Sequence, residues 1–355
     1  MEQDTDTAVA EKVEDRSAAQ ARHLAATRNE ALTEGPARDA MYARHPVVKN
    51  SLRLLTPPVK EVYDIAEQVI VHHDPGVCFT AGFRMGKTRA LGCVRGELAQ
   101  TFPDIPSATI IAKGHDDPRE GEFYSDILED YRNGAARTGK AGDRKNRILA
   151  LWEAGARAKG SDRYLLFVDE AQNWREAQFT WLRDLTNVMA ERNVEIQTLM
   201  FAHTELLTTR ATLQSKRRTD LIGRFLLSPR EFRGLRDPAE LEATLGMFDD
   251  PARHCYPEES GIALSQFFLP KAFQHGWRLR LEARSLWAAM VEVAGRTGQT
   301  PGNVGMQWVM SSIRNFLFAN ISNDSSVFTS TMDAWIYAVE ASGYENSLNG
   351  GEQGV

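Results

Sequence analysis

Apolar residues recur along the middle of the chain in short runs that alternate with longer amphipathic stretches. Four runs rich in β-branched and aromatic residues predict buried strands, at residues 77–80, 107–112, 164–168 and 196–202. Apolar positions spaced three and four apart predict helices around them, at residues 59–71, 87–100, 123–131, 146–158 and 177–191. Strands that alternate with helices of this length indicate a parallel sheet covered on both faces, which is an α/β fold.

The pattern changes after about residue 236, where only helical periodicity continues. This part predicts a separate helical domain, with helices at residues 238–248, 262–275, 278–295, 303–318 and 327–342. Residues 1–40 carry nine acids against five bases and few large apolar side chains, so we expect a disordered or loosely helical extension there, with the alanine-rich residues 17–32 as the best helical candidate. The alternative is an arm that docks on a partner and orders on assembly. The predicted organisation is an extension over residues 1–42, a core over 43–235, a helical domain over 236–343 and a disordered tail over 344–355.

A glycine-containing loop follows the first predicted strand and opens a helix. Its residues are Ala81, Gly82, Phe83, Arg84, Met85, Gly86, Lys87 and Thr88. Backbone N–H groups of such a loop bind the α- and β-phosphates of a nucleotide, Lys87 would reach the β- and γ-phosphates, and Thr88 would ligate Mg²⁺. Ala81 departs from the usual pattern, which has glycine at that position. The loop predicts ATP and Mg²⁺ as cofactors.

The third predicted strand ends in two acids, Asp169 and Glu170. In a P-loop enzyme the first acid holds the Mg²⁺ shell, and the second orients or deprotonates the attacking water. The alternative is an ordinary buried strand that runs into an acidic helix cap. Since both motifs occur in the expected order and context, they favour ATP binding by residues 81–88 with Asp169, and hydrolysis by Glu170.

Two further elements are candidates for contact with the γ-phosphate. The fourth predicted strand is expected to lie between the first, which precedes the glycine-containing loop, and the third, which ends in the two acids. His203 at its end is a candidate polar residue that senses the γ-phosphate. Alternatively, Thr204 caps the next helix and His203 is merely exposed. Arg224, at the end of a basic helix, is the first candidate for an arginine finger that acts on a neighbouring subunit's nucleotide. Arg217 and Arg218 either share that role or belong to a solvated basic face.

These motifs together resemble AAA+ ATPases, and within them the transposition regulators of the TnsC/TniB/MuB type. The resemblance spans about residues 43–233. It rests on the segments GFRMGKT, LLFVDEAQNW, LMFAHTEL and LIGRFL, and on ARHPVVKNSLRLL, which precedes the glycine-containing loop. It implies a P-loop αβα sandwich followed by a helical lid. It also implies a homo-oligomer, a ring or helical filament, that assembles on double-stranded DNA with ATP. Such assemblies receive a target-selector protein, recruit a transposase and come apart on ATP hydrolysis.

The resemblance also implies basic DNA contacts after the second strand, where Lys113 and Arg119 lie. Independently, residues 133–147 carry five bases against one acid, and residues 207–236 carry eight bases against two acids. Such patches bind phosphates without sequence preference, so we add Lys140, Arg144 and Lys145 as candidates. The alternative is that these charges form ordinary solvated loops and helix faces.

Charge and cysteine content narrow the class of protein. The 355 residues carry a net charge of −6, which argues against bulk electrostatic coating of nucleic acid. Three widely spaced cysteines indicate neither a disulfide framework nor a zinc cluster, and we find no apolar run long enough to span a membrane. We therefore expect a cytoplasmic protein. A signalling or defence ATPase and a replication loader stay open as alternative functions.

Overall fold

The computed structural model describes residues 19–349. They form two compact units. Arg53–Gly234 make up one, and the described parts of Met1–Leu52 and Leu235–Val355 make up the other. The expected α/β fold with a helical C-terminal part is confirmed. The boundaries differ from the expected 43–235 and 236–343, because residues up to Leu52 group with the helical unit.

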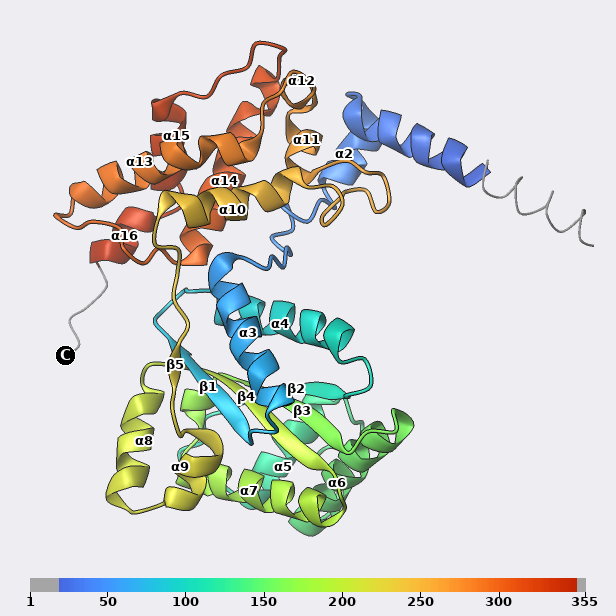
Figure 1. Cartoon of the computed structure of the whole chain (residues 1–355), viewed down its shortest axis with the longest axis vertical. Coiled ribbons are helices and arrows are strands. Elements are labelled where there is room, and N and C mark those ends of the chain that lie inside the picture. Colours follow the sequence, from blue (N-terminus) through green and yellow to red (C-terminus); the bar gives the residue numbers. More distant parts are fainter. Residues whose placement is uncertain (1–18, 350–355) are drawn as a thin grey trace, which may run out of the picture. The chain divides into compact units, whose positions relative to one another are not determined.

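Arg53–Gly234 contains a five-stranded parallel sheet with the strand order β2-β3-β4-β1-β5 (Figure 1). The strands are β1 (Gly76–Ala81), β2 (Ser107–Ile111), β3 (Arg163–Asp169), β4 (Glu195–His203) and β5 (Arg230–Glu231). As expected, β4 lies between β1 and β3. Strand β5 was not predicted from the sequence, because its two residues are both charged and show no apolar alternation.

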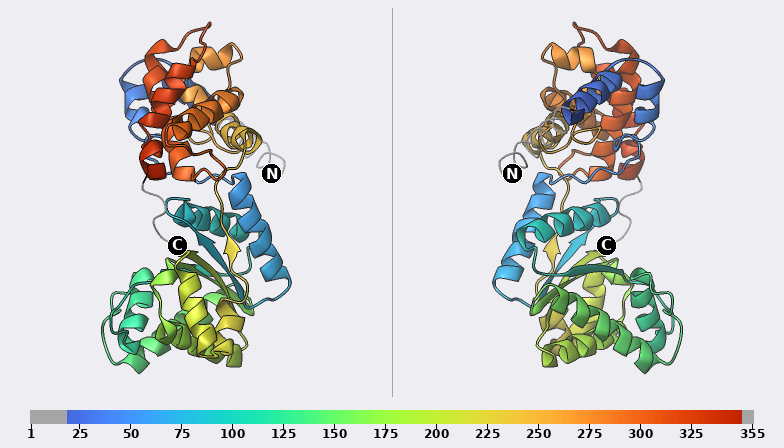
Figure 2. Two further views of the ribbon diagram at one scale, coloured as in Figure 1. Left: turned by 90° about the vertical axis from the view of Figure 1, so that its left-hand side faces the viewer. Right: turned by 90° about the vertical axis from the view of Figure 1, so that its right-hand side faces the viewer.

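Helices cover both faces of the sheet (Figure 2). One face packs against α3 (Pro57–Val71) and α4 (Lys87–Thr101), and the other against α5 (Glu120–Asp130), α6 (Ala141–Ala158), α7 (Glu176–Glu191), α8 (Leu206–Ser215) and α9 (Thr219–Phe225). Successive side chains of a strand point to opposite faces. In β3, Leu166 and Val168 pack with α5–α7, whereas Leu165 and Phe167 pack with α3 and α4. The continuous apolar run of β3 therefore serves two cores.

The second unit is helical. Its C-terminal part contains α10 (Pro238–Asp249), α11 (Leu264–Phe268), α12 (Pro270–Gln274), α13 (Ala283–Gly295), α14 (Met306–Asn320), α15 (Met332–Glu340) and α16 (Tyr344–Asn349). The helix predicted over 262–275 is two helices, because Pro270 cannot continue α11 and instead starts α12. The expected disordered tail is helical over 344–349, and Tyr344 is buried. Residues 350–355 lie outside the described residues. Over residues 19–349, no helix is long and apolar enough to cross a membrane.

Residues 19–32 are helical, as expected for the alanine-rich stretch over 17–32, and α2 (Pro36–Tyr42) follows. The structure differs from the expected flexible extension because residues 19–42 contact other residues of their unit. The Arg38 Nη2 donates to the carbonyl oxygen of Phe267 at 2.8 Å, and the Tyr256 hydroxyl donates to the carbonyl oxygen of Met41 at 2.8 Å. These contacts tie the segment to the C-terminal helices of its own unit. Residues 1–18 lie outside the described residues.

His45 lies where the N-terminal segment packs against the C-terminal part of its own unit. Its ring is fully buried, with ring centroids 4.6 Å from Tyr256, 4.7 Å from Phe267 and 4.7 Å from Phe268. The Nδ1 atom accepts from the backbone N–H of Val47 at 3.1 Å, and Nε2 has no hydrogen-bond partner within residues 19–349. Burial lowers the pKa of His45 from its ordinary 6.5 to about 3, because the apolar pocket excludes the charged imidazolium.

We expect acid to destabilise this helical unit between pH 6.5 and pH 3. In that window the unfolded chain protonates His45 while the folded chain keeps it neutral, so each pH unit costs about 1.4 kcal/mol. Thermal unfolding of the wild type and of His45→Phe, compared from pH 7 to pH 5, measures the effect. The variant should lose less stability, by up to about 2 kcal/mol over those two pH units. Parallel curves for the two proteins would contradict the assignment.

Candidate functional site: a P-loop nucleotide site

The loop between β1 and α4 has the geometry of a phosphate-binding loop. Gly86 is the N-cap of α4 and adopts a left-handed conformation with φ 96°, so the helix starts directly at Lys87. The Lys87 Nζ turns back over the loop, 3.4 Å from the carbonyl oxygen of Ala81 and 3.2 Å from that of Gly82. A lysine over a helix N-terminus places positive charge and free N–H groups at one point, which suits a polyphosphate.

The departure from the usual pattern at Ala81 costs the loop little. Ala81 is the last residue of β1, is buried and pairs in register with His203 of β4. Its φ is not positive, so glycine is not needed there; the left-handed turns fall at Arg84 (φ 60°) and Gly86. The loop therefore closes after Ala81 without a first glycine. Arg84 is the unusual residue of the loop, because residues other than glycine seldom adopt a left-handed backbone conformation.

The side chains expected to hold Mg²⁺ are in contact. Asp169 ends β3 and is 4% exposed, and its carboxylate accepts hydrogen bonds from the Thr88 side chain and from the backbone N–H of Glu170, the latter at 2.9 Å. Burial raises the pKa of Asp169, and those two hydrogen bonds oppose the rise. A hydroxyl and a carboxylate fit Mg²⁺, which keeps water and substrate phosphates as its other ligands. Accordingly, no cluster of three or more His, Cys, Asp or Glu side chains suited to a metal occurs among the described residues.

Glu170 lies at the point where the chain leaves β3. Its φ of 56° is left-handed, and it is the N-cap of the short 3₁₀ helix η1 (Ala171–Asn173). The Gln172 Nε2 donates to Glu170 Oε2 at 2.5 Å, and Gln172 Oε1 accepts from the backbone N–H of His203 at 2.8 Å. The sequence did not single out Gln172 for a role. Its one signal is its position two residues after the acid pair.

His203 lies at the carboxyl end of β4, beside the start of the phosphate loop. Its side chain is about one quarter exposed, and its ring centroid is 6.2 Å from that of Phe83, which is 78% exposed on the loop. The alternative in which Thr204 caps the next helix is wrong, since Glu205 is the N-cap of α8 and its side chain makes no cap hydrogen bond. The carboxyl ends of β1, β3 and β4 thus bring the loop, Asp169 and His203 to one edge of the sheet.

The three candidate finger arginines have different surroundings. Arg224 donates to the Thr186 hydroxyl at 2.5 Å and to the Asn187 side-chain oxygen at 2.6 Å, and burial together with nearby Arg183 lowers its pKa. Arg218 forms ion pairs with Glu176 and Asp220. Arg217 is exposed, and its side chain makes no hydrogen bond or ion pair over residues 19–349. Of the three, Arg217 can therefore reach a neighbouring subunit without first breaking a bond in its own chain.

Several expected DNA contacts are occupied by partners within the chain. Lys113 pairs with Asp126 at 3.1 Å and Glu129 at 2.8 Å, and its hydrogen bond, followed by that of Arg137, lowers the pKa of Glu129 to about 2. Arg144 lies in α6, not in a loop, and donates to two backbone carbonyls. These pairings weaken the case for both residues. Arg119 is 72% exposed and forms an ion pair with Asp117 at 3.7 Å, Lys140 is exposed as the N-cap of α6, and Lys145 is partly exposed.

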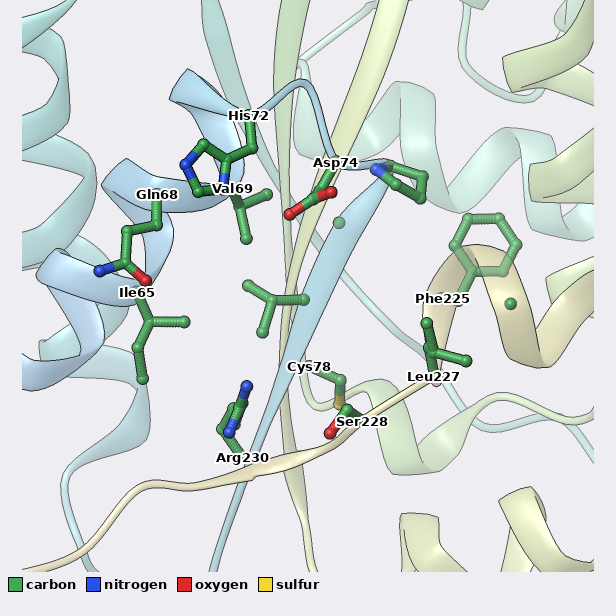
Figure 3. Close-up of a pocket in the computed structure, with 14 residues that line it drawn as sticks. Ile65, Gln68, Val69, His72, Asp74, Cys78, Phe225, Leu227, Ser228 and Arg230 are labelled. Carbon is green, nitrogen blue, oxygen red and sulfur yellow. The ribbon is translucent and has the colours of Figure 1, made fainter.

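A separate cavity of about 260 Å³ opens at the other end of β1 (Figure 3). It lies between α3 and the segment that joins α9 to β5, and its lining includes His72, Asp74, Cys78, Leu227 and Arg230. This cavity borders the amino-terminal end of β1, whereas the phosphate loop follows its carboxyl end. None of the predicted nucleotide-site residues lines it.

Comparison with known proteins agrees with this geometry. Residues 72–209 match a family described as AAA domain. No curated protein matches the chain. Among solved structures, ORC2 of Aeropyrum pernix, crystallised with ADPNP and ADP, is 15% identical, with a TM-score of 0.49 over 81% of this chain and 68% of that one.

Two further solved structures show the same level of similarity. ORC1 of Aeropyrum pernix in complex with DNA is 12% identical, with a TM-score of 0.45 over 85% of this chain and 68% of that one. Domain III of the replication initiation protein DnaA of Thermotoga maritima is 13% identical, with a TM-score of 0.42 over 83% and 96%. The family match over residues 72–209 and the strand order agree with a P-loop fold of the AAA type.

Proposed function

We propose that this protein hydrolyses ATP with Mg²⁺ at the β1–α4 loop. The observation that carries the proposal is the convergence of Lys87, Thr88, Asp169 and Glu170 at one edge of the sheet, with Thr88 and Asp169 hydrogen-bonded to each other. Lysine, hydroxyl and two carboxylates are the groups that phosphoryl transfer to water needs.

Each group has a distinct proposed role. Lys87 binds the β- and γ-phosphates, and Thr88 and Asp169 hold Mg²⁺, which when bound neutralises charge on the phosphates. Glu170 accepts a proton from the attacking water or orients it, and His203 contacts the γ-phosphate from the end of β4. An arginine of a neighbouring subunit, Arg224 or the exposed Arg217, completes the site in trans. Hydrolysis would then depend on assembly.

We further propose that the ATP-bound protein forms a ring or helical filament on double-stranded DNA and regulates DNA transposition. In this role it would link a target-selector protein to a transposase, and hydrolysis would release the assembly. The support is the resemblance of residues 43–233 to such regulators, together with the exposed bases Arg119 and Lys140 and the partly exposed Lys145. A replication initiator or loader, and a signalling ATPase, are the alternatives.

Electron microscopy of the protein with duplex DNA tests the assembly proposal. We expect rings or filaments with ATP or a slowly hydrolysed analogue, and dispersed protein with ADP or without nucleotide. Binding should weaken steeply as salt rises, since each phosphate contact releases a counterion. A protein that stays monomeric with ATP and DNA at low salt would rule out this role.

A paired variant tests the DNA contacts. Arg119→Ala combined with Lys145→Ala should reduce the slope of log affinity against log salt by about two, one per phosphate contact. Arg157→Ala is the control, because Arg157 is a 79% exposed base on α6 that pairs with Glu153 at 2.8 Å and is not among the proposed DNA contacts. An unchanged slope for the double variant would remove both residues from the interface.

A further inference from the structure

The short turn after β3 is held on both sides by its own amide side chains. Asn173 Nδ2 donates to the carbonyl oxygen of Ala112, just beyond β2, at 3.0 Å. Gln172 Oε1 accepts from the backbone N–H of His203, the last residue of β4, at 2.8 Å. Of these two amide side chains, that of Gln172 also contacts the Glu170 carboxylate, through Nε2 at 2.5 Å from Oε2. One side chain therefore joins the carboxylate proposed to activate water to the strand end proposed to contact the γ-phosphate.

We infer that Gln172 is a positioning residue that couples the end of β4 to Glu170. The inference rests on the proposed ATPase function and adds a residue to it. Gln172 does not touch the reacting atoms; it acts by fixing where the Glu170 carboxylate lies. A displacement of His203 when the γ-phosphate binds or leaves would pass through the Gln172 amide to that carboxylate.

The orientation of the Gln172 amide follows from its two partners. The backbone N–H of His203 can only donate, so the amide oxygen must face it. The amide nitrogen then faces the Glu170 carboxylate, which when ionised can only accept. Reversing the amide would place two donors together at His203 and two acceptors together at Glu170. Both bonds therefore form in one orientation, and the side chain has a fixed direction.

The same contacts leave Glu170 able to do chemistry. Gln172 occupies only Oε2, and a carboxylate has further acceptor sites on its second oxygen. A hydrogen bond to an ionised acceptor is stronger and more directional than a neutral one. The left-handed backbone of Glu170 starts the turn, and the Gln172 bond holds the side chain that the turn projects.

A double-mutant cycle tests the inference on the full-length protein. Gln172→Leu keeps the side-chain size and removes both hydrogen bonds. We expect kcat for ATP hydrolysis to fall about tenfold, a fraction of the 10²–10⁴ that a positioned general base contributes, with KM for ATP within about threefold. In a Glu170→Gln background, Gln172→Leu should cause almost no further loss, because its effect passes through Glu170.

Asn173→Leu is the matched control, because the Asn173 side chain supports the same turn without contacting the Glu170 carboxylate, and the substitution keeps the backbone N–H that donates to the Glu170 carbonyl oxygen. Any loss of rate that it causes should recur in the Glu170→Gln background. The inference is overturned if Gln172→Leu retains the wild-type kcat, or if it lowers kcat by the same factor in both backgrounds. A wild-type protein without ATPase activity would overturn the proposed function and this inference together, whereas an active wild type with a normal Gln172→Leu overturns the inference alone.

Discussion

Replacing Glu170 with Gln is expected to lower kcat for ATP hydrolysis by about 10²- to 10⁴-fold while ATP still binds. The amide keeps the size and hydrogen-bonding reach of the carboxylate but cannot take up a proton from water. Lys87, Thr88 and Asp169 are untouched, so phosphate and Mg²⁺ binding should persist. Steady-state hydrolysis and equilibrium ATP binding, measured on the same preparation, separate the two effects.

The same variant should prolong ATP-bound assemblies on DNA, because turnover would no longer release them. Glu195→Gln is the matched control: that carboxylate is 42% exposed at the start of β4, the opposite end of the strand from His203, and has no proposed part in hydrolysis. Its rate should match the wild type. If Glu170→Gln hydrolysed ATP at the wild-type rate, another group would have to activate the water.

Replacing Lys87 with Ala is expected to weaken ATP binding by at least about 100-fold, since hydrogen bonds from a charged group contribute roughly 1.5–3 kcal/mol each. Within residues 19–349, Lys87 forms no ion pair, and its Nζ rests on two loop carbonyls that a phosphate can replace. Calorimetric titration with Mg²⁺ and ATP measures the loss.

Assembly on DNA should fail in the same variant, because the ATP-bound state would not be populated. Lys60→Ala is the control, because Lys60 is 60% exposed on α3 and forms an ion pair with Asp64 at 2.7 Å. It should bind ATP as the wild type does. Equal ATP affinity in Lys87→Ala and Lys60→Ala would place the nucleotide elsewhere.

The sheet and the nucleotide loop could be predicted because their signals are local. An apolar run such as residues 164–168 must be buried, and a Gly-Lys-Thr sequence at the start of a helix has one well-understood use. The order of β4 between β1 and β3 followed from the same motifs. By contrast, β5 is two charged residues whose pairing with Phe79 and Thr80 leaves no pattern in the sequence.

Pairings between distant residues could not be predicted. The resemblance marks Lys113 and a count of bases marks Arg144 as candidates for phosphate contact, but only the fold shows that acids and carbonyls of the same chain already occupy them. Likewise, the polar, alanine-rich residues before 43 look unfit for a core. Arg38 nevertheless donates to the carbonyl oxygen of Phe267, and His45, just after these residues, is buried against Tyr256; both partners are more than 200 positions away.

The grouping of Met1–Leu52 with Leu235–Val355 has a consequence for synthesis on the ribosome. The nucleotide-binding unit is one continuous stretch, so it can fold as soon as Gly234 has left the exit tunnel. The helical unit is interrupted by that stretch, and His45 must wait for Tyr256, Phe267 and Phe268 to be made. A nascent chain would therefore gain its ATP site before its N-terminal residues have a core to join.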